Sequence, residues 1–265
     1  MTSLAAWAAV DARAISSFYL VSDSRITFDD GRPPFDRAQK LFASSRYADL
    51  FGYCGQVDFP LPTLLRVLKM IDDGRLFSSG DGADVRNEKF EEEVKDSFAT
   101  YSIKKDFTVL HASRAGEGMN ASYFLWSIAW SIEQGWITQT LQLPTESAIV
   151  LSEGSGGRAV LQYNEQWRYR LPGTSRSVFS AFSDALESGE DYKSGGAMQL
   201  VGFYRKGPGR YFGVIQKGRR FLMGDETMDM ERCARFEWRN RAFELCDFRT
   251  LERLPKAQRH PRPKA

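Results

Sequence analysis

The second residue of the chain is the strongest candidate for a nucleophile. Thr2 follows the initiator residue Met1, and a small residue at this position usually permits methionine removal. Thr2 would then carry a hydroxyl and a free α-amine on adjoining atoms. The pKa of an α-amine is about 7.7 to 8, so this amine can accept the hydroxyl proton near neutral pH without a histidine. Taken alone, Met-Thr is more often the start of an ordinary chain, so the rest of the sequence must decide.

Other catalytic residue types are scarce. The two histidines, His111 and His260, leave little material for a Ser-His-Asp or Cys-His mechanism. We interpret His111, which lies in an apolar segment, as structural. Residues 154–157, Gly-Ser-Gly-Gly, lack the Lys-Ser/Thr that follows a phosphate-binding loop, and no dinucleotide-binding or Cys-x-x-Cys motif is present.

Three cysteines, Cys54, Cys233 and Cys246, are too few and too scattered for a disulfide framework or a zinc site. They suit a reducing cytosol. We therefore expect no metal ion and no cofactor, and a cytoplasmic location.

Six short segments occur in an order and spacing that resemble those of proteasome β subunits and their bacterial relatives. They are Thr2-Ser-Leu-Ala-Ala6, Ser22-Asp-Ser-Arg25, Gln39-Lys-Leu-Phe42, Gly52-Tyr-Cys-Gly55, Glu153-Gly-Ser-Gly156 and Asp191-Tyr-Lys-Ser-Gly-Gly196. Each segment alone is compatible with a surface ion pair, a strand-end turn or an ordinary loop. The preserved order over residues 2 to about 224 favours an N-terminal nucleophile (Ntn) hydrolase of the proteasome β-subunit type.

The resemblance implies a role for each matching residue. Thr2 Oγ1 would attack the scissile carbonyl, with its own α-amine as general base. Lys40 would place a positive charge beside that amine and lower its pKa, and Asp23 would hold Lys40 in position, since a buried lysine without a partner is costly.

The remaining motif residues would surround the reacting atoms. The backbone N–H of Gly55 would donate to the oxyanion, although one extra residue after Lys40 leaves Gly52 as an alternative. Three polar residues would hydrogen-bond around the amine and hold the nucleophile: Ser155, Asp191 and Ser194.

These roles predict a threonine-type peptidase that hydrolyses peptide bonds of peptides or unfolded proteins. By the same resemblance, identical subunits would close into a ring with Thr2 facing an inner chamber, and an ATPase is the kind of activator that such a chamber would need. Two alternatives remain open. One is a small-molecule amidase or acylase that works without a ring; the other is a non-catalytic ring scaffold.

The elements that must position these residues follow from the hydrophobic pattern. Strand-forming runs occupy residues 3–10, 18–22, 39–44, 50–54, 107–112, 121–129, 147–151, 198–204, 211–215 and 219–223. Helical spacing covers residues 62–71, 87–103 and 157–167, and a helix opened by Thr174 or Ser175 runs to a stop near Gly189. This order predicts an α+β fold: a four-layer αββα sandwich of the Ntn-hydrolase type, with two antiparallel sheets flanked by helix pairs.

The length of 265 residues suits one generous domain with an appended tail. We assign residues 1–224 to the Ntn-hydrolase domain and residues 225–265 to a C-terminal extension. Residues 225–254 are charged and mostly helix-compatible, and the basic, proline-broken residues 256–265 predict a mobile tail.

The composition gives no reason to expect nucleic acid or a membrane as a partner. Lys and Arg nearly balance Asp and Glu, for a net charge of +2. No apolar stretch approaches the roughly 18 residues needed to span a bilayer. Residues 4–10 are apolar but too short, and lack the positive leader, for a signal peptide.

Overall fold

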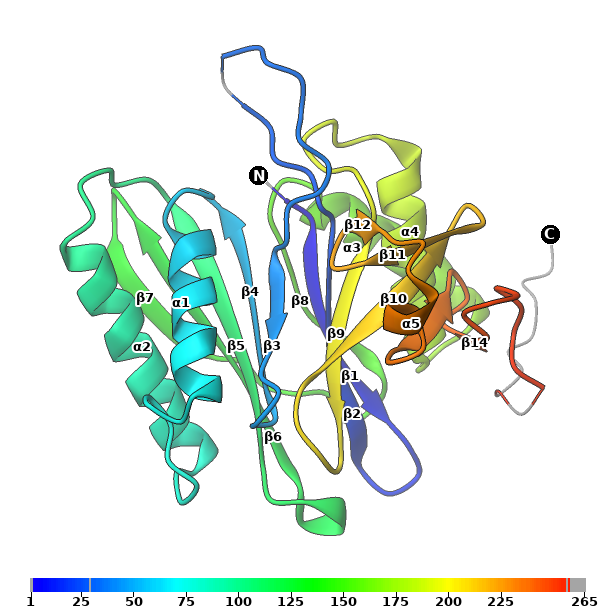
Figure 1. Ribbon diagram of the computed structural model, residues 1–265, viewed down its shortest axis with the longest axis horizontal. Helices are drawn as coiled ribbons and strands as arrows, with labels where there is room; N and C mark the ends of the chain where they lie inside the picture. The colour runs from blue at the N-terminus through cyan, green and yellow to red at the C-terminus, as the bar shows by residue number, and fades with distance from the viewer. Residues whose placement is uncertain (1, 29, 256, 258–265) are drawn as a thin grey trace.

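The computed structural model describes residues 2–28, 30–255 and 257. Met1, His260 and nearly all of the predicted tail at 256–265 lie outside the described residues. Two β-sheets dominate the described part of the chain, and they run side by side through the middle of the molecule (Figure 1).

The larger sheet contains both the start of the chain and its last strands. Its strands are β1 (Leu4–Val10), β2 (Ile15–Ser22), β8 (Ala148–Glu153), β9 (Gln199–Tyr204), β10 (Arg210–Gln216), β11 (Arg219–Leu222), β12 (Asp225–Glu226), β13 (Glu237–Asn240) and β14 (Leu245–Cys246). The order is β12-β11-β10-β9-β2-β1-β8, with antiparallel neighbours throughout, and β13 pairs in parallel with β10. Strand β1 therefore lies between two partners, β2 and β8, which fix the start of the chain.

The smaller sheet is a run of antiparallel strands in the order β3-β4-β5-β6-β7. Its strands are β3 (Leu41–Ala43), β4 (Asp49–Gly55), β5 (Phe107–Ala115), β6 (Ser122–Ser131) and β7 (Gly135–Thr140). Leu50 and Leu110 of this sheet pack against Leu4, Phe18 and Leu20 of the larger sheet in one buried cluster. One face of each sheet is thus buried against the other.

Helices α1 (Pro60–Asp72) and α2 (Ala83–Ala99) pack on the smaller sheet. The apolar residues Phe90 and Phe98 recur on one side of α2, as helical spacing requires, and lie in a buried cluster with Phe51 of β4 and Ile128 of β6. A proline in the first turn of α1 suits a helix start, because its missing N–H has no helical partner there.

Helices α3 (Gly157–Arg170) and α4 (Ser175–Ser188) pack on the larger sheet, away from α1 and α2 (Figure 1). Phe179 and Phe182 of α4 share a buried cluster with Trp7 of β1. The predicted limits of α4 are confirmed: Thr174 Oγ1 accepts from the Ser177 backbone N–H at 3.2 Å, and Gly189 ends the helix in the left-handed conformation. The expected two sheets are present, but the larger sheet is not purely antiparallel as predicted, because β13 runs parallel to β10.

The segment after residue 224 differs from the expectation of helix. Its described part contains only one short helix, α5 (Met230–Cys233), and the short strands β12, β13 and β14 join the larger sheet. Trp238 of β13 is 1% exposed, and its indole packs where a side chain at Gly213 of β10 would stand. Trp238 is the only fully buried residue of β13, and its neighbours in the strand are charged or polar. The sequence therefore lacks the apolar pattern that would predict a strand. The boundary at residue 224 stays a prediction.

Among the described residues, no helix combines the length and the apolar character that crossing a bilayer requires.

Candidate active site

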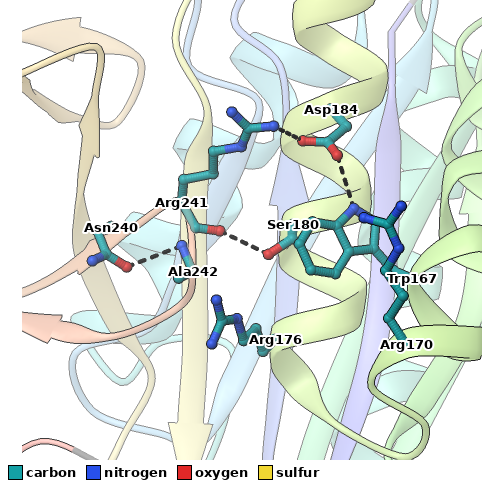
Figure 2. A pocket seen from close by; sticks show the side chains of 8 residues that line it. All are labelled: Trp167, Arg170, Arg176, Ser180, Asp184, Asn240, Arg241 and Ala242. Atoms are coloured by element: carbon teal, nitrogen blue, oxygen red, sulfur yellow. Dashed lines mark hydrogen bonds and ion pairs between the residues drawn. The ribbon is translucent and has the colours of Figure 1, made fainter. Parts of the chain in front are cut away.

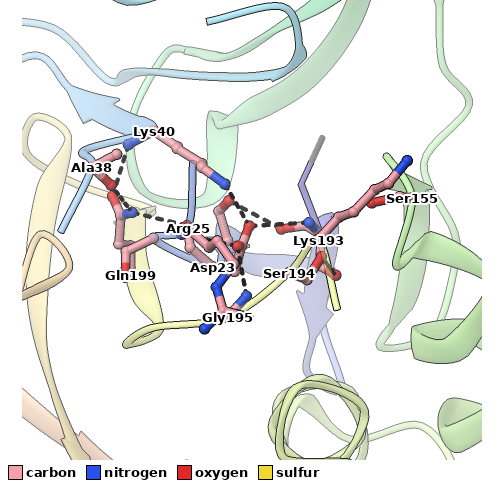
Figure 3. A network of polar contacts seen from close by, with 12 residues as sticks. Asp23, Arg25, Ala38, Lys40, Ser155, Lys193, Ser194, Gly195 and Gln199 are labelled. Carbon is pink, nitrogen blue, oxygen red and sulfur yellow. Dashed lines mark hydrogen bonds and ion pairs between the residues drawn. The ribbon is translucent and has the colours of Figure 1, made fainter. Parts of the chain in front are cut away.

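The candidate residues come from six places in the chain that meet at one end of the two sheets. Thr2 precedes β1, Asp23 follows β2, and Lys40 precedes β3. Gly55 ends β4, and Ser155 lies in the turn between β8 and α3. Asp191 and Ser194 belong to the loop between α4 and β9. Figure 3 labels Asp23, Lys40, Ser155 and Ser194 among the polar contacts of this region.

Thr2 lies inside the protein at the head of β1. Thr2 is 0% exposed while Met1 precedes it. Its Oγ1 has no hydrogen-bond partner among the described residues. The next residue is held on three sides. Ser3 N donates to Asp23 Oδ1 at 3.1 Å, Ser3 O accepts from Asp23 N at 3.2 Å, and Ser3 Oγ donates to Ser194 Oγ at 2.8 Å. The backbone that carries Thr2 is therefore fixed.

Lys40 and Asp23 form a fully buried ion pair. Lys40 Nζ lies 2.8 Å from Asp23 Oδ1, and both side chains are 0% exposed. Burial lowers the pKa of the Lys40 ammonium below its ordinary value, while the neighbouring Asp23 carboxylate opposes that shift. Because Ser3 N contacts the same oxygen, the lysine ammonium lies within two hydrogen-bond lengths of the peptide that joins Thr2 to Ser3.

The other oxygen of the Asp23 carboxylate is also occupied. Asp23 Oδ2 accepts from the backbone N–H groups of Arg25 and Gly195, each at 3.0 Å. Three N–H groups and one ammonium thus contact this carboxylate. A buried charge requires such partners, because it has lost its hydrogen bonds to water.

Gln199 fixes the chain on either side of the ion pair. Its Oε1 accepts from Lys40 N at 2.9 Å, and its Nε2 donates to the carbonyls of Asp23 at 3.0 Å and Ala38 at 2.7 Å (Figure 3). Gln199 lies outside the six motif segments and was not predicted as a site residue. The signal was available, because Gln199 is a polar residue at the start of an otherwise apolar strand.

Ser155, Asp191 and Ser194 form a second network that reaches the first through Ser3. Asp191 Oδ2 accepts from Ser155 Oγ at 2.6 Å and from Ser194 Oγ at 2.8 Å. Burial raises the pKa of the Asp191 carboxyl, but these hydrogen bonds, together with the backbone N–H and the charge of Lys193, outweigh it and leave the pKa below its ordinary value. A Cβ at Gly156 would stand 1.9 Å from Ser3 Oγ, so this network requires glycine there.

The geometry distinguishes the two glycines of the Gly-Tyr-Cys-Gly segment. Gly52 lies in mid-strand, and a Cβ there would meet the side chains of Leu41 and Leu4 in the core. Gly55 has φ +89° and lines a pocket of about 290 Å³ that Ser155 also lines. This placement favours Gly55 over Gly52 for the oxyanion role, which remains a prediction.

Arg25 ends the Ser22-Asp-Ser-Arg25 segment, and no role was predicted for it. Its Nε and Nη2 donate to Asp36 at 2.7 and 2.8 Å, and its Nη1 donates to Tyr192 O at 3.0 Å. It packs so closely on Gly195 that a Cβ there would lie 2.3 Å from the guanidinium carbon. Arg25 therefore holds the loop before Lys40 against the loop that carries Asp191 and Ser194.

His111 lies outside this site. It is 0% exposed, and its ring nitrogens lie 2.9 Å from Asn87 Oδ1 and from Asp49 Oδ1. Burial lowers the pKa of its imidazole. In the described part of the chain, no group of three or more His, Cys, Asp or Glu side chains is arranged to hold a metal ion.

No protein-family model and no curated protein matches the sequence. Solved structures do match the fold. Anbu from Yersinia bercovieri, described as an ancestral β-subunit, is 11% identical with a TM-score of 0.51, over 88% of this chain and 90% of that one. This is a proteasome-like fold.

A second match is a Gly-1 mutant of Anbu from Hyphomicrobium sp. strain MC1. It is 11% identical with a TM-score of 0.50, over 89% of this chain and 92% of that one. At this identity the similarity establishes the fold alone, and a function for this chain must be argued from its own residues.

Proposed function

We propose that the chain is a threonine peptidase, with Thr2 as its nucleophile once Met1 has been removed. The observation that supports this most is the buried pair of Lys40 and Asp23, whose shared oxygen also accepts from the N–H next to Thr2. An ion pair taken fully out of water rarely adds stability over apolar residues of the same volume. A charge kept at that cost, linked through one carboxylate oxygen to the Thr2–Ser3 peptide, suits catalysis at Thr2.

The first half of the reaction needs only the first residue, the lysine and an oxyanion donor. Thr2 Oγ1 attacks the peptide carbonyl carbon, and its proton passes to the α-amine of the same residue. The positive charge of Lys40 lowers the pKa of that amine and keeps it in the neutral, proton-accepting form. Negative charge develops on the carbonyl oxygen, where the Gly55 N–H is our candidate donor.

The second half returns the enzyme to its starting state. The C–N bond of the substrate breaks, the leaving amine takes the proton held by the α-amine, and an ester remains on Thr2. Water then attacks this ester, again losing a proton to the α-amine, which returns it to Oγ1. Ser155, Asp191 and Ser194 hold the amine and hydroxyl during both halves through the network that reaches Ser3.

The same proposal covers the finer architecture and the assembly. We propose that the three buried clusters separate the four layers of an αββα Ntn-hydrolase sandwich. Identical subunits close into a ring whose inner chamber contains Thr2. Peptides and unfolded proteins are the substrates that can enter this chamber. The three cysteines are free and buried, which suits a cytoplasmic protein.

Intact-mass spectrometry with a peptide epoxyketone tests the nucleophile directly, because this probe bonds to both the hydroxyl and the amine of an N-terminal threonine. We expect a purified chain that lacks Met1 and gains one probe mass, with the adduct on Thr2. Thr2→Ser should keep the reaction and Thr2→Ala should abolish it, and both small residues still permit methionine removal. Thr140→Ala, at an exposed position of β7, is the matched control and should label as the wild type does.

A folded chain that has lost Met1 but neither reacts with the probe nor hydrolyses peptides would overturn the proposal in favour of a non-catalytic scaffold. Labelling by a chain that remains a monomer or dimer would keep the Thr2 chemistry and replace the ring peptidase with a small-molecule amidase. Size-exclusion chromatography with light scattering separates these outcomes.

A further inference from the structure

A second pocket lies away from the candidate active site, where the C-terminal extension meets α3 and α4. Its volume is about 450 Å³, within the range of small-molecule sites. The walls include Trp167 and Arg170 of α3, Arg176 and Asp184 of α4, and Arg241 from the turn after β13 (Figure 2).

Arg176 is the unusual residue of this pocket. It is 5% exposed, and neither its Nε nor its Nη1 has a hydrogen-bond partner among the described residues. Figure 2 shows its guanidinium extending toward the side of the pocket formed by Ala242. Burial lowers the pKa of Arg176, and the through-space effect of Glu244 opposes this without a direct contact. A buried guanidinium with unused donors is costly unless an anion meets it.

The carboxylate in the pocket wall is already engaged. Asp184 accepts from Trp167 Nε1 at 2.8 Å and from the guanidinium of Arg241. A second carboxylate, Glu187, lies 3.5 Å from the Arg241 guanidinium. Arg241 is therefore neutralised, whereas neither Arg170 nor Arg176 forms an ion pair in the described part of the chain. The pocket therefore keeps two guanidinium groups that have no ion-pair partner among the described residues.

The pocket is also held in shape. Ser180 Oγ donates to Arg241 O at 3.0 Å, and Asn240 Oδ1 accepts from Ala242 N at 3.0 Å, so the turn after β13 is fastened to α4 (Figure 2). The Trp167 indole N–H is used by Asp184, which leaves the ring as an apolar wall.

We propose that this pocket binds a small organic anion, with a carboxylate or phosphate group on Arg176, an apolar body against Trp167, and Arg170 adding positive charge on the other side of the pocket (Figure 2). The planar guanidinium of arginine presents paired N–H donors that match the oxygens of such groups. This site stands apart from the peptidase chemistry, and its test needs no hydrolysis.

Calorimetric titration of the full-length chain at constant ionic strength tests the proposal. Benzoate and phenyl phosphate carry the two anionic groups on one apolar body, and benzyl alcohol is the neutral control. We expect saturable binding of at least one anion and none of the alcohol, and the anion that saturates identifies the group recognised. Arg176→Met should weaken binding by about tenfold or more, the usual effect of losing one charge-assisted hydrogen bond. Arg170→Met, which removes only a positive charge from the other side of the pocket, should weaken binding by a smaller factor.

Arg168→Met is the matched control. Arg168 is an exposed arginine of α3, the helix that also carries Arg170, and it pairs with Glu146 and Glu165 outside the pocket. Its loss should leave binding unchanged. If Arg176→Met does not fold, the exposed Arg170 decides the question through its own variant. The proposal is wrong if neither anion saturates, or if the folded pocket variants bind as tightly as the wild type does.

Discussion

The buried ion pair gives a stability prediction that does not depend on any activity. In Lys40→Met the Asp23 carboxylate loses its counterion but keeps three N–H donors, at 3.1, 3.0 and 3.0 Å. Removal of one partner from a buried pair typically costs 3 to 5 kcal/mol. Because those donors remain, we expect Lys40→Met to lower the free energy of unfolding by about 3 kcal/mol, the lower end of that range.

The reverse change should cost more. Asp23→Ala leaves the Lys40 ammonium buried without an ion-pair partner and strands the three N–H groups, each of which adds about 1 kcal/mol or more. We therefore expect a loss of about 5 kcal/mol or more. The double variant Asp23→Ala/Lys40→Met should be more stable than Asp23→Ala alone, because it no longer buries an unpaired ammonium.

Urea unfolding followed by tryptophan fluorescence measures these differences, at one protein concentration because association adds stability. Arg37→Met is the matched control. Arg37 lies 3.7 Å from Asp225, with side chains 71% and 59% exposed, so its loss should cost about 1 kcal/mol or less. If Lys40→Met costs no more than Arg37→Met, the burial argument is refuted, and with it the main support for the proposed mechanism.

Three further predictions concern single residues. Gly55→Ala should lower the free energy of unfolding by about 1 to 3 kcal/mol, because φ is +89° and the new Cβ would stand 2.7 Å from Asp106 O; Gly80→Ala, with open space around it, should change little in the same urea assay. Trp238→Ala should cost about 3 to 5 kcal/mol, and a calorimetric loss below about 1 kcal/mol would show that β13 adds little to the core. The pKa of Asp191 lies below its ordinary value of 3.8. The stabilisation by Asp191 is therefore present above that pH and is lost as the pH falls through the lower pKa of the folded state. Acid unfolding profiles of the wild type and Asp191→Asn that run parallel below pH 3.8 would contradict this.

The pattern of apolar residues predicted most of the central elements. Helix α4 was predicted within one residue at either end, because Thr174 and Gly189 are chemically specific start and stop signals. The site residues were expected together because the resemblance linked segments far apart in the chain. The structure brings Asp23 to Lys40, and Ser155 and Ser194 to Asp191, while the chemical role of each remains a proposal.

The missed elements share a physical cause. Strand β7 is mostly exposed beyond Trp136, so its sequence lacks the apolar run that marks a buried strand. Strands β12 to β14 are two to four residues long, and β12 and β13 carry charged side chains. Such short segments are too brief for periodicity to separate strand from helix. Gln199 and Arg25 act by hydrogen bonds to backbone atoms brought together by the fold, and such partners cannot be identified before the fold is known.

The burial of Thr2 limits when Met1 could be removed. Strand β1 is paired on both sides, and Thr2 is already enclosed at its head. An aminopeptidase must reach the first residue and the few that follow it, so we expect it to cut the Met1–Thr2 bond before β1 takes its place between β2 and β8. The Met1 removal that we propose should therefore occur during synthesis. Folded chain that still carries Met1 should keep its mass when methionine aminopeptidase is added, whereas the same chain unfolded and diluted into the enzyme should lose one methionine.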